Sequence, residues 1–359
     1  MTYRHGGSPH FDLARFGLVK RPVTDFSVSL NPLGPPGIIR EKWPDLFDAV
    51  KNYPSPHGAG VVRYYEEKFG LSPDSIIPGN GSTELIYLIP RAIGLKKTAI
   101  LAPCFYDYEQ AALLAGAKIC RQTLSSADNF ALPSPDNLIA LLDKVDSLWI
   151  GRPNNPTGIF FGKTLLTELA VRFPDKWFIV DEAFIQFLDN HRSETFLTRN
   201  LRPNILVIHS LTKFYALAGL RLGAGVGHSE TIARLKHFRE PWSINAIADQ
   251  CAPLLLDLYE YENKTLAMLR DEQSRFFKTL SGIDGVRVFG GSASFILCQW
   301  MRTPDLDDLL FYLLKNGVYV RDCRNFPGLE SNFFRIGLRK PDENMRLAAL
   351  LGSYPEGRA

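Results

Sequence analysis

Short apolar runs alternate with helix-like stretches in the middle of the chain, and this alternation constrains the fold more than any other feature. The runs lie at 75–78, 98–103, 147–151, 177–184 and 204–210. Continuous apolar strands separated by helices predict an α/β fold with a mostly parallel sheet that is covered on both faces. In sheets of this kind, ligands bind beyond the carboxyl ends of the strands.

The chain of 359 residues is long enough for two domains. Residues 1–45 contain the Gly- and Pro-rich strings "HGGSPH" and "NPLGPPG", which predict an extended N-terminal arm with turns rather than a helix. We expect a large domain over 46–245. A smaller α+β domain over 246–359 is expected to begin with one long helix, at 246–281.

The overall composition is that of an ordinary globular protein, with 45% hydrophobic and 22% charged residues. A net charge of +3 predicts neither nucleic-acid nor membrane binding. There is no apolar run of membrane-spanning length and no signal-peptide core, so we expect a cytoplasmic protein. The five cysteines form no CxxC pair, which favours free thiols over a disulfide framework or a metal site.

Four polar strings follow the expected strands, and the sheet would bring them to one edge. They are "GNGSTE" (79–84), "RPNNPTG" (152–158), "DEAF" (181–184) and "SLTK" (210–213). They offer a phosphate-binding turn, an amide, a carboxylate and a lysine, which is the set that pyridoxal phosphate requires. The lysine forms a Schiff base with the aldehyde, and the carboxylate keeps the ring nitrogen protonated. Backbone N–H groups at a helix start, with an arginine, hold the phosphate.

Each string alone has an ordinary structural explanation, such as a turn, a helix cap or a surface lysine. The string "GAGVG" (223–227) lacks the spacing of a dinucleotide-binding loop. The joint order decides the interpretation. Asn155, Asp181, Lys213 and Arg221 are separated by 26, 32 and 8 residues, so that roughly one βα unit separates each of the first three.

Over nearly its whole length the sequence resembles the fold-type I, aspartate-aminotransferase-like enzymes that use pyridoxal phosphate. Within them it is similar to histidinol-phosphate aminotransferases, and more similar to the L-threonine O-3-phosphate decarboxylases of cobalamin biosynthesis. The strings that favour the decarboxylases are "HGG" (5–7), "NPLG" (31–34), "DEAFIQF" (181–187), "SLTKFYALAGLRLG" (210–223), "PWSINAIA" (241–248) and "CRNFPGLESNFFRIGLR" (323–339). The resemblance implies that the arm packs with the small domain.

The resemblance also implies roles at the cofactor. Lys213 would be the Schiff-base lysine, Asp181 would pair with the ring nitrogen, Asn155 would hydrogen-bond the phenolic oxygen, and Phe105 would stack on the ring. The cofactor phosphate would be held by Gly81, Ser82, Thr83, Ser210 and Arg221. Tyr53 resembles a tyrosine that reaches the neighbouring subunit's cofactor phosphate, which implies a homodimer with shared active sites.

At the substrate, Arg335 resembles the arginine that clamps the α-carboxylate, with Asn155 beside it. Three further arginines lie nearby in sequence and could bind a second anion, a phosphate: Arg321, Arg324 and Arg339. His5 and Asn31 of the arm could close over that anion. Arg324 has no counterpart in the decarboxylase pattern, and a solvated position is an equal alternative for it.

Phe184 stands where the aminotransferases usually carry a tyrosine, which resembles the decarboxylases, although neutral drift would have the same result. The implied reaction is decarboxylation of L-threonine O-3-phosphate to (R)-1-aminopropan-2-yl phosphate and CO2. The alternatives are a histidinol-phosphate or aromatic aminotransferase and an L-serine O-phosphate decarboxylase, whose substrate is one methyl smaller. A non-catalytic regulator that binds the cofactor would need a DNA-binding segment, for which the chain has no room.

Overall fold

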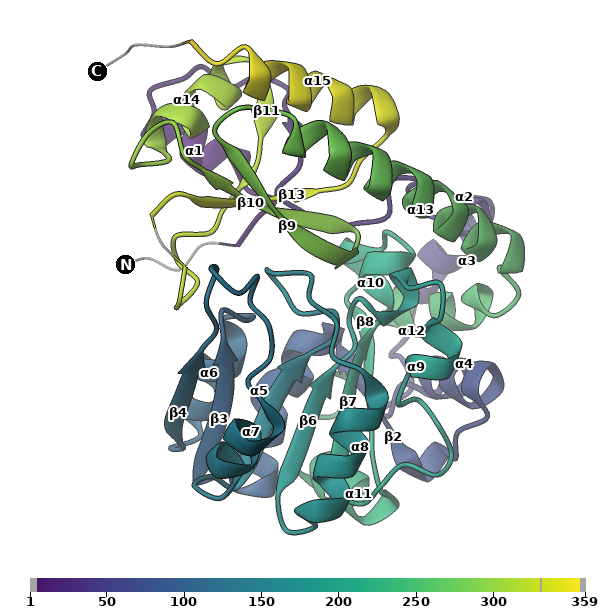
Figure 1. Cartoon of the computed structure of the whole chain (residues 1–359). Coiled ribbons are helices and arrows are strands. Elements are labelled where there is room, and N and C mark those ends of the chain that lie inside the picture. The colour runs from purple at the N-terminus through teal and green to yellow at the C-terminus, as the bar shows by residue number, and fades with distance from the viewer. Residues whose placement is uncertain (1–4, 330, 356–359) are drawn as a thin grey trace.

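The computed structural model describes residues 5–329 and 331–355, and its elements gather into two bodies (Figure 1). The lower body in Figure 1 contains the large sheet and the helices around it, and the upper body contains a smaller sheet with α13, α14 and α15. Within the described residues, every helix falls short of the length and apolar character that crossing a bilayer requires. The boundaries expected at residues 45 and 245 stay predictions.

The large sheet has seven strands in the order β2-β8-β7-β6-β5-β3-β4. In chain order these are β2 (Ile76–Asn80), β3 (Lys97–Ala102), β4 (Lys118–Thr123), β5 (Ser147–Gly151), β6 (Trp177–Asp181), β7 (Ile205–Ser210) and β8 (Leu222–Val226). Only the pairings of β8 with β7 and with β2 are antiparallel, so the expected mostly parallel sheet is confirmed.

Two strands of this sheet were not expected from the sequence. The edge strand β4 is largely exposed and lacks a continuous apolar run. The strand β8 is glycine-rich, and its neighbours leave little room for a side chain at Gly223 and Gly225. A Cβ at Gly223 would lie 2.7 Å from the carbonyl oxygen of His209. The string that failed as a nucleotide-binding loop is therefore a buried strand, where glycine permits close backbone approach.

Helices cover both faces of the large sheet. They are α4 (Ala59–Phe69), α5 (Gly81–Ile93), α6 (Asp107–Leu114), α7 (Pro135–Leu142), α8 (Lys163–Arg172), α9 (His191–Glu194), α10 (Leu211–Phe214), α11 (Ser229–Phe238) and α12 (Ala246–Cys251). Successive strand residues point to opposite faces. Ile179 thus packs in one apolar cluster with residues of α5, α6 and α11, whereas Phe178 and Val180 pack in another with residues of α7 and α8.

The upper body is built on a four-stranded antiparallel sheet in the order β12-β13-β10-β9. Its strands are β9 (Val286–Ala293), β10 (Phe295–Trp300), β12 (Arg321–Asp322) and β13 (Phe333–Gly337), and its helices are α13 (Tyr259–Ser281), α14 (Asp307–Lys315) and α15 (Pro341–Gly352). In the arm, β1 (Thr24–Asp25) pairs in parallel with β11 (Val318–Tyr319).

The expectation that the arm has no helix is wrong, because it contains α1 (Pro9–Arg15) and α2 (Gly37–Glu41), and α3 (Trp43–Asp48) begins before residue 45. Pro9 stands at the first position of α1, where its fixed φ suits a helix start. Leu13 of α1 then packs against Leu314 and Tyr319. Tertiary packing therefore stabilises a helix that the Gly- and Pro-rich flanks concealed.

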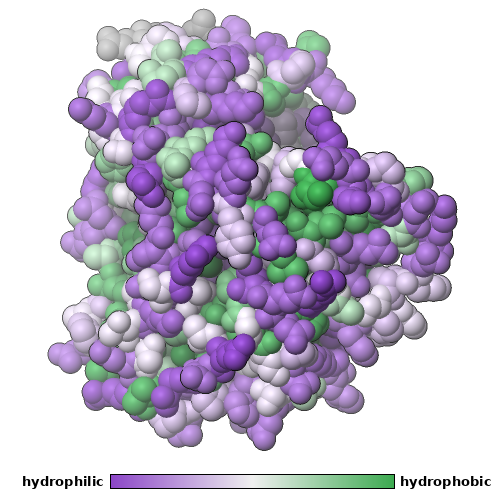
Figure 2. All heavy atoms as spheres, turned by 90° about the vertical axis from the view of Figure 1, so that its right-hand side faces the viewer, coloured by the Kyte–Doolittle hydropathy of each residue, from purple (hydrophilic) through white to green (hydrophobic). Residues whose placement is uncertain are grey.

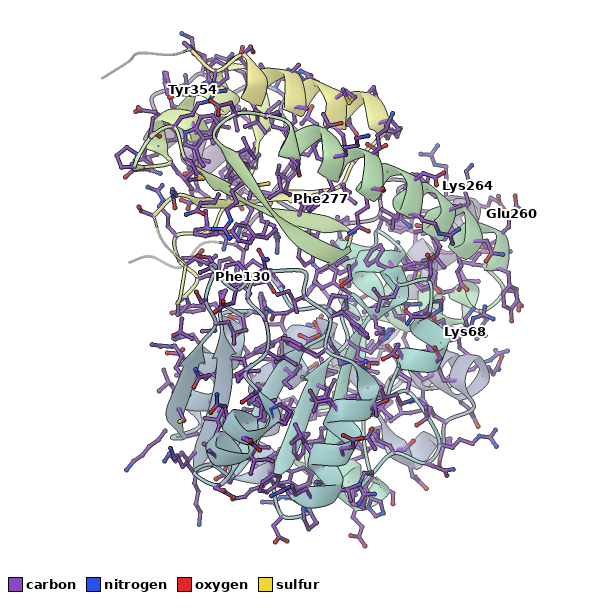
Figure 3. The ribbon with its side chains drawn as sticks, in the orientation of Figure 1. Lys68, Phe130, Glu260, Lys264, Phe277 and Tyr354 are labelled. Atoms are coloured by element: carbon purple, nitrogen blue, oxygen red, sulfur yellow. The ribbon has the colours of Figure 1, made fainter. Side chains whose placement is uncertain are left out.

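The single helix expected at 246–281 is broken into α12, a 3₁₀ turn (η5, Ala252–Leu255) and α13. Pro253 lies in the turn and cannot donate a helical hydrogen bond. The 23-residue α13 is amphipathic, with Glu260 and Lys264 on its outer side (Figure 3) and Thr265 and Leu269 buried. Figure 2, which shows the right-hand side of Figure 1, has mainly hydrophilic side chains with apolar ones dispersed among them.

A buried ion pair fixes the loops that follow β5 and β6. Arg152 and Glu182 are both fully buried, and Arg152 Nη1 lies 2.5 Å from Glu182 Oε1. Arg152 also donates to the carbonyl oxygen of Phe161 at 2.8 Å, and Glu182 accepts from the Thr195 hydroxyl at 2.6 Å. Because Asn155 follows Arg152 by three residues and Asp181 directly precedes Glu182, this pair holds two expected site residues in place.

Replacing Glu182 with alanine would leave the Arg152 charge buried with only part of its partners. Breaking a buried pair on one side costs about 3–5 kcal/mol, so we expect a clear fall in the midpoint of thermal unfolding. The matched control is Glu67→Ala, which removes an exposed pair with Arg63 and should leave the midpoint nearly unchanged. Equal midpoints for the two variants would contradict the role given to the Arg152–Glu182 pair.

Candidate active site

A pocket of about 320 Å³ lies at the carboxyl ends of the large-sheet strands, with the arm and the small sheet on its other sides. Its polar, charged and aromatic lining includes His5, Ser27, Ser29, Ser82, Thr83, Phe105, Tyr108, Asn155, Asp181, Phe184, Thr212, Lys213, Arg221, Arg321, Phe326 and Arg335. The volume is within the range of small-molecule sites. The structure thus brings together most of the residues singled out in the sequence.

Lys213 lies on the short helix α10, directly after β7, and its half-buried side chain faces the pocket. Loss of water, followed by the charges of Arg335 and Arg221, lowers its pKa to about 8, while the charge of Asp181 acts in the opposite direction. A lysine with this pKa has a substantial fraction of free amine near neutral pH. It is therefore suited to act as a nucleophile toward an aldehyde.

Asp181 ends β6 and is buried. Its Oδ2 accepts a hydrogen bond from the Tyr108 hydroxyl at 2.6 Å, and its Oδ1 accepts one from the Ala183 N–H at 2.8 Å. Burial raises the pKa of this carboxyl, while these hydrogen bonds and the Lys213 charge act in the opposite direction. Within the described chain, no salt bridge is formed to Asp181, so a protonated ring nitrogen would supply the cation that this carboxylate lacks.

The start of α5 forms an anion cradle with Arg221. Gly81 is the first residue of α5 and has φ +71°, and a Cβ there would overlap the Arg221 guanidinium. The Gly81 N–H donates to the carbonyl oxygen of Arg221 at 2.9 Å, and Ser82 and Thr83 line the pocket beside it. A helix N-terminus with hydroxyls and a guanidinium is suited to a phosphate group.

Ser210 lies near this phosphate-binding site but outside the pocket lining. Its hydroxyl is 2.8 Å from the Thr212 hydroxyl, and it is Thr212 rather than Ser210 that lines the pocket. The residue carried over from the resemblance therefore reaches the pocket through a neighbour.

Arg335 of β13 is held by three different contacts. It hydrogen-bonds Asn155 Oδ1 and the carbonyl oxygen of Ser27, and its guanidinium lies 4.9 Å from the Phe295 ring centre. Phe295 in turn packs edge-on against Phe184, with ring centres 5.0 Å apart. The aromatic residue at position 184 thus supports the arginine that is expected to bind a carboxylate.

Arg321 and His5 form another side of the pocket. Arg321 is buried, donates to Asn325 Oδ1 at 2.9 Å and lies over the Phe326 ring. The His5 ring is 6.0 Å from that of Phe105. Loss of water, followed by the charges of Arg321 and Lys213, lowers the pKa of His5. A neutral imidazole beside a guanidinium can still donate a hydrogen bond to an anion.

Two arginines expected at the substrate are instead engaged by nearby carboxylates outside the pocket lining. Arg324 forms ion pairs with Asp305, Asp307 and Asp322 at 2.9, 2.6 and 2.8 Å. Arg339 pairs with Glu343 at 3.0 Å and donates to the carbonyl oxygen of Asp25 at 3.2 Å. Both guanidiniums are therefore satisfied within the protein and lie outside the pocket lining, and substrate binding by Arg339 stays a prediction.

Asn31 and Tyr53 also lie outside the pocket lining. The buried Asn31 amide donates to the carbonyl oxygen of Phe214 and to the Thr265 hydroxyl, so its contacts are made within the protein, and the expected substrate contact stays a prediction. Tyr53 is 87% exposed and packs against Trp242, with ring centres 5.6 Å apart. Its expected role at a partner's cofactor stays a prediction.

Several pocket residues were not foreseen, among them Tyr108, Thr212 and Ser29. The Ser29 hydroxyl is buried, lines the pocket and has no hydrogen-bond partner within the described residues. The alternation of small polar residues in "FSVS" (26–29) is the signal that could have pointed to it. Tyr108 follows Phe105 by three residues, but nothing in the sequence shows that its hydroxyl reaches Asp181.

Comparison with known proteins gives a consistent result. The family described as aminotransferase class I and II matches residues 21–350. The threonine-phosphate decarboxylase of Salmonella typhimurium is 32% identical over 358 residues, which cover 99% of this chain and 97% of that protein. The crystal structure of the histidinol-phosphate aminotransferase from Clostridium acetobutylicum has a TM-score of 0.84 and 29% identity, covering 91% and 97% of the two chains.

A further solved structure supports the fold alone, because its identity is only 23%. It is the L-threonine-O-3-phosphate decarboxylase from Porphyromonas gingivalis, with a TM-score of 0.83 and coverage of 92% of this chain and 99% of that one. The fold and the lysine–carboxylate–arginine pocket define a fold-type I enzyme that uses pyridoxal phosphate, whose groups the pocket fits. The chain belongs to the class I and II aminotransferase family.

Removing the Tyr108 hydroxyl should weaken cofactor binding, because Asp181 would lose a donor that favours its charged form. A hydrogen bond to a charged group contributes about 1.5–3 kcal/mol, so Tyr108→Phe should raise the Kd for pyridoxal phosphate by roughly 10- to 150-fold in a titration of the apoprotein. Tyr87→Phe is the control, since that hydroxyl donates to Asp107 away from the pocket lining. An unchanged Kd for Tyr108→Phe would show that Asp181 does not depend on this hydrogen bond.

Proposed function

We propose that the protein decarboxylates L-threonine O-3-phosphate to (R)-1-aminopropan-2-yl phosphate and CO2. The observation that carries the proposal is the charge of the pocket. Among its described lining residues, Lys213 and three arginines face a single acidic group, Asp181. The similarity to the Salmonella typhimurium decarboxylase supports the same substrate.

Three arginines match the three anionic groups of the reaction. Arg221, at the start of α5, would hold the cofactor phosphate. Arg335 would bind the substrate carboxylate through its planar fork, and Arg321 with His5 would bind the substrate phosphate. Ser29 offers an unpaired buried hydroxyl to the same substrate. Histidinol phosphate carries a phosphate but no carboxylate, so it would leave one of these two substrate-side arginines without an anion in that step.

When bound, pyridoxal phosphate supplies an aldehyde that captures the substrate amine and a ring that accepts the electron pair released at Cα. The protein determines which bond of Cα is broken by fixing the two ends of the substrate. Arg321 and Arg335 lie on the neighbouring strands β12 and β13 and are register partners. Binding energy from the distant phosphate can therefore be used to orient the bond between Cα and the carboxylate.

The bond from Cα to the carboxylate carbon breaks and CO2 leaves, and the electron pair of that bond, which the ring would take up, forms the new Cα–H bond when a proton is added. Lys213 Nζ is the group in the pocket that can deliver this proton. Its pKa of about 8 permits the amine to take up a proton and to release it near neutral pH. Asp181 would pair with the ring nitrogen and does not need to exchange a proton in this step.

We also propose that the enzyme is a cytoplasmic homodimer. Exposed aromatic and aliphatic side chains gather near the first helices: Trp43, Phe47, Val50, Tyr53 and Trp242. Such a surface suits a second copy of the chain, whose Tyr53 would reach the cofactor phosphate. The five cysteines are free thiols, which suits the reducing cytoplasm.

The first experiment is incubation of the holoenzyme with L-threonine O-3-phosphate and no keto acid. We expect CO2 and aminopropanol phosphate, detected by mass spectrometry. L-serine O-phosphate is the comparison substrate and should react more slowly by roughly 10- to 200-fold, if the missing methyl group leaves part of the pocket unfilled. Absence of CO2, followed by turnover of histidinol phosphate once 2-oxoglutarate is added, would identify an aminotransferase instead.

Shared active sites can be tested by mixing variants. Tyr53→Ala and Lys213→Ala subunits, unfolded and refolded together, should regain activity above the sum of the two alone, because one site of the mixed dimer contains both residues. The control pair is Lys213→Ala with Asp181→Ala, which lie in the same subunit's pocket and should show no rescue. Equal results for both mixtures would refute a site that spans two subunits.

A further inference from the structure

Asn31 connects three separate parts of the molecule directly beneath the reactive lysine. Its backbone N–H donates to the carbonyl oxygen of Lys213 at 3.0 Å. Its side-chain nitrogen lies 2.8 Å from the carbonyl oxygen of Phe214, 2.7 Å from the Thr265 hydroxyl and 2.9 Å from the Tyr261 hydroxyl. The arm, α10 and α13 therefore meet at one buried amide.

The helix that carries Lys213 depends on such outside donors. The helix α10 has only four residues, and helices of this length are not stable by themselves. The last carbonyl groups of a helix have no partner within it. Asn31 donates to two consecutive carbonyl groups at this end, those of Lys213 and Phe214, and so helps to determine the direction in which the lysine side chain leaves the backbone.

The same arm segment also faces the substrate side of the pocket. Ser27 and Ser29 line the pocket and precede Asn31 by four and two residues. Ser27 additionally accepts a hydrogen bond from Arg335 at its carbonyl oxygen, 3.2 Å away. The chain between Ser27 and Asn31 thus links the carboxylate-binding arginine to the backbone of the lysine.

Tyr261 of α13 adds hydrogen bonds to this contact between the arm and α10. The Tyr261 hydroxyl donates to the carbonyl oxygen of Gly34 at 2.8 Å, and the carbonyl oxygen of Phe214 lies within 3.2 Å of it. The Asn31 Oδ1 accepts from the Leu33 N–H at 3.0 Å, which keeps the amide oriented with its N–H groups toward α10 and α13. Each hydrogen-bonding atom of the Asn31 side chain is used.

We propose that Asn31 is a positioning residue, which holds the amine of Lys213 at a fixed position relative to the arm residues that line the pocket. It acts through Lys213 and touches neither the pocket nor a substrate. The inference rests on the proposed function for the identity of the substrate. Loss of the amide would lower turnover, because the Lys213 amine, which donates the proton, would no longer be held in a fixed position relative to the substrate.

The chain contains a matched control for a purely structural role. Asn204 is also buried, and its side-chain nitrogen donates to three carbonyl oxygens, those of Ala170, Phe173 and Lys176, at 3.0 to 3.1 Å. It precedes β7, at the end of the sheet opposite the pocket. Asn204→Ala therefore removes an equivalent buried amide without touching the lysine.

The experiment compares Asn31→Ala with Asn204→Ala as holoenzymes, well below their unfolding midpoints. Both variants should be less stable than the wild type. Only Asn31→Ala should lower kcat, by roughly 10- to 100-fold, as expected for a small displacement of a reacting group. Only Asn31→Ala should also change the pH at which the absorption band of the bound cofactor shifts, because that band reports the ionisation of its link to Lys213.

The charged and titratable groups that face Lys213 from other elements are Asp181, Arg221, Arg335 and His5, and neither substitution changes them. The band titration needs cofactor and no substrate. If the wild type releases no CO2 from threonine phosphate, the proposed function fails while the band titration still tests Asn31. Equal kcat and equal band titrations for the two variants would reduce Asn31 to a structural residue and overturn the inference.

Tyr261→Phe provides a milder variant if Asn31→Ala does not fold. It removes the hydroxyl that contacts Asn31, Gly34 and Phe214 and keeps the ring. We expect its kcat and its band titration to change in the same direction as those of Asn31→Ala, by a smaller amount. A Tyr261→Phe enzyme with wild-type values for both would equally overturn the inference.

Discussion

The parallel register of β5, β6 and β7 determines where the chemistry lies. Gly151 at the end of β5 pairs with Asp181 at the end of β6, and Asp181 is in register with Ile208 near the end of β7. The three strands therefore end at one level, and the loops that follow them deliver an amide, a carboxylate and a lysine to the same space. The buried Arg152–Glu182 pair reinforces this alignment, because it connects the segments that directly follow β5 and β6, next to Asn155 and Asp181.

Burial and neighbouring charges then shift the pKa values of Lys213 and Asp181. The pocket gathers cations at a place where water is scarce, so the charge of Lys213 is disfavoured by burial first and by Arg335 and Arg221 next. Burial disfavours the charged form of Asp181, and hydrogen bonds are the main interactions that stabilise that form. Anionic ligands and a cationic ring nitrogen would relieve both kinds of imbalance. The pocket is thus complementary to a cofactor and a substrate that carry phosphate and carboxylate groups.

The sequence predicted those parts of the site that follow directly from regular structure. Lys213, Asp181 and Asn155 were found because they follow apolar strands, and the end of such a strand is fixed by the periodicity of the chain. The sequence could not show that Asn31, Arg324 and Arg339 lie outside the pocket lining, because the direction of a side chain in an irregular arm, or beside other charges, depends on tertiary neighbours. The carboxylates around Arg324 are spread over positions 305 to 322, and no local pattern shows that they enclose it. The strand β8 was missed because its glycines serve backbone contacts with neighbours distant in sequence.

The reversed direction of β8 has a consequence for how the chain can vary. Every other strand of the large sheet must return through a crossover before it can present a residue at the carboxyl edge. Because β8 runs the opposite way, it begins at that edge, and Arg221 reaches the pocket only eight residues after Lys213. The covalent anchor and the phosphate anchor of the cofactor thus belong to one short connection, residues 211–221. Insertions are tolerable in the crossovers on either side, whereas a change of length within this connection would displace both anchors at once.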